Sequence, residues 1–348
     1  MVDANGTADF AGADWHGEQL ERAKALFESV ETGGGSADLR ARILGQAPSP
    51  GEFLAGGVAA FRDLLRIEGR PSRFQRLLRS WIGKVTSAIR TDDFAAAGRW
   101  MEALKIDPIY PSEFSDRVTS SIAELSRPEV LDDLVVRLAK AGDPPEANAL
   151  LEAWGRPLVA YLVYGMVVDD PPVNRRHLVG YLAIAGRDDV ALLTERLSDA
   201  RWFIVRNVAI AVGMTGRKQA IPSLEMVLGH EDDRVRVEVV RSLAQLDAST
   251  AIDRLMTAMA DSSPRVRQAA VSLLRASPSG EVIPGIIEII ERGAVGNDDA
   301  RRLVSVIAER KGEDASDALA QLAARRFGAG RTVRDAARAA LDRRGAAA

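Results

Sequence analysis

Three regularly spaced arginines in the second half of the chain could bind anionic groups. Arg206, Arg236 and Arg267 each follow a valine at the start of an apolar stretch, at intervals of about 30 residues, the length of one short helical repeat. We call them the anchor arginines. A guanidinium group donates hydrogen bonds from a planar fork that matches carboxylates and phosphates. Recurrence at equivalent positions predicts either a surface that captures anions or a row of internal ion pairs.

Acidic residues in the preceding turns support the second interpretation. These residues could pair with the arginines within or between repeats, and this internal pairing is the favoured interpretation of the anchor arginines. The residues concerned are Asp199, Asp232, Asp233 and Asp261.

The cluster Arg201-Trp202-Phe203 is the most unusual local feature. Two adjacent aromatic residues at a helix start cannot both face the core easily, and Trp with Arg is typical of binding hot spots. The alternative is that Trp202 fills the joint between two repeats. We expect Trp100 and Trp154 to lie in the core.

The elements that must position these residues are helices. Apolar residues recur at intervals of three and four, and no segment of this half alternates like a strand. Each repeat interval contains two helices; one ends near Thr215-Gly216, and the next carries Pro222 in its first turn. Further copies are expected at Arg176, around Arg301-Arg302 and at Val333-Arg334. One helix pair cannot bury its apolar face alone, so the pairs must stack as an all-α solenoid of tandem antiparallel helix pairs.

This period and pairing resemble the HEAT repeat, in particular the short HEAT-like repeats of the phycobilisome lyase family. The resemblance is clearest over residues 170–278. It implies that the second helix of each pair lines a concave face, and that aspartates and arginines form a ladder between repeats. HEAT-like families are mostly scaffolds and adaptors; a minority are lyases, hydroxylases or DNA-repair enzymes.

We hypothesise that a partner binds on this face, because the residues concerned occupy equivalent positions in successive repeats. The predicted partner-binding residues are Trp202, Arg206, Asn207, Arg236, Glu238, Arg267 and Gln268.

The rest of the chain is predicted in three parts. Residues 1–17 are polar and expected to be disordered, residues 18–125 form an irregular helical region, and residues 126–345 form the solenoid. The region before residue 125 caps the solenoid, or alternatively forms a separate helical domain. Its helices are expected over residues 17–31, 53–67, 74–89, 94–104 and 113–125, with a flexible Gly-Gly-Gly linker at 33–35.

Composition excludes several classes of site. The chain has no cysteine and only three histidines, so thiolate metal sites, iron–sulfur clusters, cysteine nucleophiles and histidine-rich metal sites are not expected. HEAT-like hydroxylases bind metal through several His-Glu steps, whereas this chain has the single step His230-Glu231. Acid pairs such as Asp298-Asp299 are adjacent, so on a helix they diverge by about 100°. We therefore expect neither catalytic residues nor a cofactor.

The expected function is a cytoplasmic scaffold or adaptor that binds a protein or peptide. No signal peptide is recognisable, and the apolar run 158–168 is too short to span a membrane. Nucleic-acid binding is the alternative, favoured by a dense run of arginines but opposed by interleaved acids and a net charge of −3. A lyase-like enzyme is the less favoured alternative. The arginines concerned are 201, 206, 217, 234, 236, 241, 265 and 267.

Overall fold

The structure is a computed structural model that describes residues 50–103, 112–248, 251–325 and 330–345. The chain divides into two compact units, Met1–Gly57 and Val58–Ala348. Each unit is considered by itself, and nearly all described residues belong to the second. The predicted tail at 1–17, the helix at 17–31 and the linker at 33–35 lie outside the described residues.

Every regular element among the described residues is a helix, so the all-α prediction is confirmed. Before residue 170 the α-helices are α3 (Pro50–Ile67), α4 (Pro71–Arg90), α5 (Phe94–Glu102), α6 (Ser115–Leu125), α7 (Pro128–Lys140), α8 (Asn148–Trp154) and α9 (Arg156–Gly165). The four described helices predicted before residue 125 correspond to α3, α4, α5 and α6. Their bounds could be predicted because apolar side chains follow the helical period and prolines mark two of the starts.

Two-helix repeats follow. Their elements are α10 (Arg175–Ala185), α11 (Ala191–Thr194), α12 (Trp202–Met214), α13 (Ile221–Glu225), α14 (Asp233–Leu246), α15 (Ala251–Ala258), α16 (Pro264–Ala276), α17 (Val282–Glu291), α18 (Asn297–Glu309), α19 (Glu313–Ala324) and α20 (Arg331–Gly345). The copies predicted at Arg176, Arg301-Arg302 and Val333-Arg334 lie in α10, α18 and α20. Helix α12 ends as expected, since Gly216 adopts a positive φ of 70° just past the cap.

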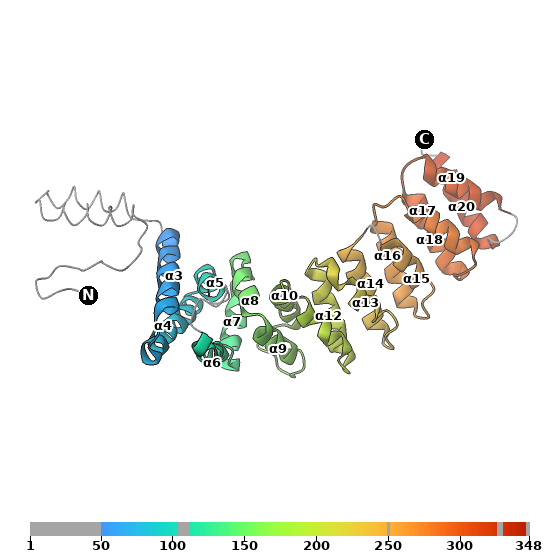
Figure 1. The fold of residues 1–348 in the computed structure, drawn as a ribbon. Coiled ribbons are helices and arrows are strands. Elements are labelled where there is room, and N and C mark those ends of the chain that lie inside the picture. The colour runs from blue at the N-terminus through green and yellow to red at the C-terminus, as the bar shows by residue number, and fades with distance from the viewer. Residues whose placement is uncertain (1–49, 104–111, 249–250, 326–329, 346–348) are drawn as a thin grey trace, which may run out of the picture. The chain divides into compact units, whose positions relative to one another are not determined.

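The second helices of the pairs form one layer. Helices α10, α12, α14 and α16 contact one another in order, as Figure 1 shows, and α15, α17 and α19 form the companion layer. Apolar side chains between the layers make a continuous core from α14 onward; Val240, Val266 and Leu303 in it are all at most 2% exposed. This stacking of nearest neighbours is the organisation expected of an α-solenoid.

Helices α12 and α14 approach each other closely. A Cβ added to Gly213 would lie 2.7 Å from the Cβ of Ser242, so only glycine fits there. The Ser242 hydroxyl also donates a 2.8 Å hydrogen bond to the carbonyl of Ala209 on α12. This contact holds the two helices in a fixed register.

The region before residue 125 packs directly on the helices that follow it. Helix α5 contacts α8, and Ser126, the C-cap residue of α6, accepts a 3.0 Å hydrogen bond from the Trp154 indole N–H. Trp100 and Trp154 are 5% and 3% exposed, which confirms that they are core residues.

The apolar run at 158–168 contains most of α9, which is largely buried although Tyr164 is 66% exposed. Leu158 and Leu162 on α9 are fully buried within the second unit. Among the helices of the described segments, none has both the length and the apolar character needed to cross a bilayer.

Candidate functional site

The register of the repeats is set by the residues that cap the second helices. Arg201, Asp232 and Ser263 are the N-cap residues of α12, α14 and α16, and the two intervals between them are equal. Two residues before each, a side chain accepts a hydrogen bond from the backbone N–H of the N-cap residue. These acceptors are Asp199, His230 and Asp261, at distances of 2.9, 3.0 and 2.7 Å.

This register corrects the predicted equivalence of the anchor arginines. Arg236 and Arg267 each lie four residues after an N-cap, whereas Arg206 lies five residues after Arg201. One residue turns a helical side chain by about 100°, so Arg206 points to a different face from the other two. Its positional equivalent on α16 is Gln268.

Arg236 is an internal ion-pairing residue. Its Nε and Nη2 each donate to Asp261 at 2.8 Å, and its Nη1 donates to the carbonyls of His230 and Glu231 at 2.6 and 3.0 Å. The side chains of Arg236 and Asp261 are only 12% and 14% exposed. Burial raises the pKa of the Asp261 carboxyl, but hydrogen bonds from Arg236 and from the Ser263 N–H outweigh it, so the net pKa is lowered.

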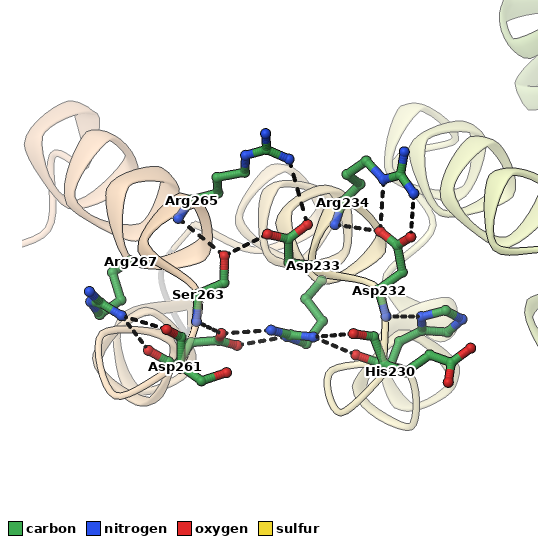
Figure 2. Close-up of polar contacts among 11 residues, drawn as sticks. His230, Asp232, Asp233, Arg234, Asp261, Ser263, Arg265 and Arg267 are labelled. Carbon is green, nitrogen blue, oxygen red and sulfur yellow. Dashed lines mark hydrogen bonds and ion pairs between the residues drawn. The ribbon is translucent and has the colours of Figure 1, made fainter.

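Arg267 repeats this arrangement one unit later. Its Nε donates to Asp299 of α18 at 2.6 Å, and its Nη1 donates to the carbonyls of Asp261 and Ser262 at 2.8 and 3.0 Å. Asp261 and Arg267 together therefore link three successive repeats. Figure 2 shows Asp261 beside Ser263 and Arg267. For Arg236 and Arg267, the internal ladder is the arrangement observed.

Of the other predicted ladder acids, Asp199 and Asp232 pair locally, whereas Asp233 contacts the next repeat. Asp232 forms a two-point ion pair with Arg234, and Asp199 forms the same pair with Arg201 (Figure 2 shows the first). In each case the arginine side chain lowers the pKa of the carboxyl from 3.8 to about 2. Asp233 accepts from the Ser263 hydroxyl at 2.7 Å and lies 3.8 Å from Arg265.

A groove of about 500 Å³ lies on the layer of second helices, on the face that Arg206 reaches. Four arginines and one acid supply its charge, and smaller or apolar side chains supply the rest. We call this space the groove; it is lined by Trp202, Arg206, Arg234, Val237, Glu238, Arg241, Arg265, Gln268, Ala269 and Ser272.

Glu238 lies in the groove between two arginines. Its Oε1 accepts from Arg206 Nη2 at 3.2 Å and from Arg241 Nη1 at 3.0 Å. The Glu238 side chain is 12% exposed, whereas those of Arg206 and Arg241 are 37% and 55% exposed. Asn207, which is buried, accepts a further hydrogen bond from Arg206 Nη1 at 3.2 Å. Glu238 and Asn207 therefore hold the Arg206 guanidinium in place while leaving it accessible.

Trp202 forms an aromatic wall of the groove. The guanidinium carbon of Arg234 lies 3.4 Å from the centre of the indole ring, a cation–π contact, and the ring of Phe203 meets the indole edge-on. Trp202 is partly buried, so it both contacts its neighbours and faces the groove.

The structure thus divides the predicted partner-binding residues. Four of them line the groove: Trp202, Arg206, Glu238 and Gln268. The remaining three do not: Asn207 accepts a hydrogen bond from Arg206, and Arg236 and Arg267 belong to the ladder.

Sequence reasoning missed Arg234, Arg241 and Arg265 as groove residues. A signal was present, because Arg234 and Arg265 are separated by the same one-repeat interval as Arg236 and Arg267. Arg241 follows Glu238 by three residues, a spacing that brings side chains together on a helix.

The groove has no recognisable metal chemistry. Within the described parts of the chain, no group of three or more His, Asp or Glu side chains is arranged to hold a metal ion. An arginine-rich groove with an aromatic wall is instead suited to binding an anionic ligand by ion pairs and surface contact.

Part of the repeat region matches a known family. The family model of HEAT repeats matches residues 224–342. Residues 224–342 therefore belong to the HEAT-repeat family. The match begins in α13, includes α14 and α16, and extends further toward the C-terminus than residue 278, where the resemblance in the sequence fades.

Solved structures offer weaker likenesses. The complex of CpcE and CpcF of phycocyanin lyase from Nostoc sp. PCC7120 is 16% identical, with a TM-score of 0.29 over 61% of this chain and 94% of that one. An engineered protein is also 16% identical, with a TM-score of 0.29 over 95% and 96% of the two chains. Neither likeness carries a functional argument. No curated protein matches the chain.

Proposed function

We propose that this helical-repeat scaffold binds a partner protein in the groove formed by α12, α14 and α16. Binding rather than catalysis is proposed because the groove combines accessible arginines with an aromatic wall. The observation that carries the proposal is the position of Arg206, which is fixed by Glu238 and Asn207 yet remains 37% exposed at the groove. A cation held in place loses less side-chain entropy when a ligand binds.

Affinity capture of the tagged full chain from its native lysate tests this proposal. The test variant is Trp202→Ala with Arg206→Glu. Arg236 is unsuitable, because loss of a buried ion-pairing residue would destabilise the fold itself. The matched control is Arg292→Glu, which reverses a 73% exposed charge at the end of α17, outside the groove.

The proposal predicts a discrete protein that survives nuclease treatment, is captured by the wild type and the control, and is lost with the groove variant. Thermal melting must show that the groove variant stays folded. Loss of the captured material on nuclease treatment would favour the nucleic-acid alternative. Equal capture by the groove variant would show that the partner does not bind in the groove.

A further inference from the structure

The charge of the groove indicates which kind of partner segment it takes. Arg206, Arg234, Arg241 and Arg265 line it together with the acid Glu238. Asp232 and Asp233 neutralise part of this charge from beside the groove, which leaves one positive charge in excess. The side chains of Arg234, Arg241 and Arg265 are 48%, 55% and 71% exposed, so a ligand can reach them without unfolding a helix. The groove is therefore complementary to negative charge.

A ligand carboxylate would contact the same two arginines that Glu238 already contacts. One of its oxygens, Oε1, accepts from both Arg206 and Arg241. Each guanidinium has more N–H donors than these contacts use, so both can bind a second carboxylate. Glu238 orients the two arginines and also repels any anion that approaches them.

Apolar surface lies beside these charges. The Trp202 indole, Val237 and the buried Ala269 line the same groove. An occupant that fills it must bring an apolar side chain as well as negative charge, a combination that peptides supply readily.

The acids beside the groove weigh against nucleic acid. Asp232 pairs with Arg234, and Asp233 lies 3.8 Å from Arg265. Binding to nucleic acid relies on basic residues that neutralise several successive phosphates, and interleaved carboxylates oppose this. Discrete peptide carboxylates can instead be placed beside individual arginines.

We infer that the groove binds an acidic peptide segment carrying an aliphatic side chain, and that Glu238 limits its affinity by competing for Arg206 and Arg241. This inference rests on the proposed function and specifies the chemistry of its partner.

Fluorescence anisotropy of a labelled peptide of about twelve residues, alternating Glu with Leu, tests the inference on the full chain. Comparison probes are the same peptide with Gln for Glu and a single-stranded DNA of similar length. The variant Glu238→Gln keeps the side-chain shape and removes the competing charge. Its control, Glu225→Gln, removes an equal charge on α13, which lies outside the groove.

We expect the acidic peptide to bind better than the Gln peptide or the DNA, and to weaken with added salt. Glu238→Gln should tighten binding about fivefold, the effect of one unit charge a few ångströms away in a solvated groove. Glu225→Gln should not. Arg241→Gln should weaken binding by a similar factor. Because Arg241 is exposed, this variant tests the inference even if Glu238→Gln affects folding.

Preference for DNA, equal binding of the Gln peptide, or weaker binding by a folded Glu238→Gln variant would each overturn the inference. These results are separable from failure of the proposed function. A captured partner that depends on the groove but lacks an acidic segment would leave the proposed function intact and reject only this inference.

Discussion

Replacing Arg236 with methionine is the sharpest test of the ladder. The change keeps most of the aliphatic stem but removes two hydrogen bonds to Asp261 and two to backbone carbonyls. Breaking a fully buried ion pair by removing one partner costs about 3–5 kcal/mol. The pair here is 12% and 14% exposed, and Asp261 keeps its hydrogen bond from Ser263, so we expect about 2–3 kcal/mol, below the fully buried range.

Hydrogen exchange measured by mass spectrometry is the suitable assay, because a repeat protein can open locally. Amides of α14 and α16 should exchange about 30- to 150-fold faster in the Arg236→Met variant, whereas those of α4 and α5 should be unchanged. The matched control is Arg201→Met. Arg201 makes the same two-point pair with Asp199, at 2.8 and 2.7 Å, but is 45% exposed, so its loss should have a far smaller effect. Equal effects of the two variants would refute the argument that burial decides the contribution.

Two further predictions concern helix packing and acid. Gly213→Ala should destabilise the chain by about 1–3 kcal/mol in urea unfolding, because the new Cβ would clash with Ser242. Gly180→Ala should instead stabilise it by about 0.5–1 kcal/mol, because a Cβ there meets nothing within 4 Å. The reverse order of stability would contradict the packing described. The pKa values of Asp199 and Asp232 are lowered from 3.8 to about 2 in the folded chain, so both carboxylates stabilise the fold at a pH above about 4. This contribution should be lost as the pH falls from about 4 to about 2, which an acid titration of the unfolding free energy would show.

Much of the helical architecture could be predicted from the sequence. The apolar period of three to four residues, the prolines at helix starts and Gly216 at a helix end are local signals, and each acts through nearest neighbours. Helices α3 to α6 and the repeats from α10 onward follow these signals closely. A local pattern was sufficient because solenoids are assembled from contacts between adjacent units.

The site was only partly predictable. Alignment on the Val-Arg step placed Arg206 with Arg236, but the repeat register follows the N-cap residues, and α12 carries its valine and arginine one residue later. Asp261, the partner of Arg236, was among the acids predicted to pair, but Asp299, the partner of Arg267, was not. Asp299 lies a full repeat beyond Arg267 and meets it only when α16 and α18 stack. A sequence pattern alone does not specify which neighbouring repeat supplies the carboxylate.

The central claim, that the groove of α12, α14 and α16 is the partner-binding surface, is tested most directly by site-specific photo-crosslinking in the native cell. A photoreactive amino acid replaces Gln268, which is exposed and lines the groove, or Met226, which is 87% exposed at the end of α13 and does not. The account predicts one dominant protein adduct from position 268 that survives nuclease and is absent from position 226. Adducts of equal yield from both positions, or only from position 226, would contradict it.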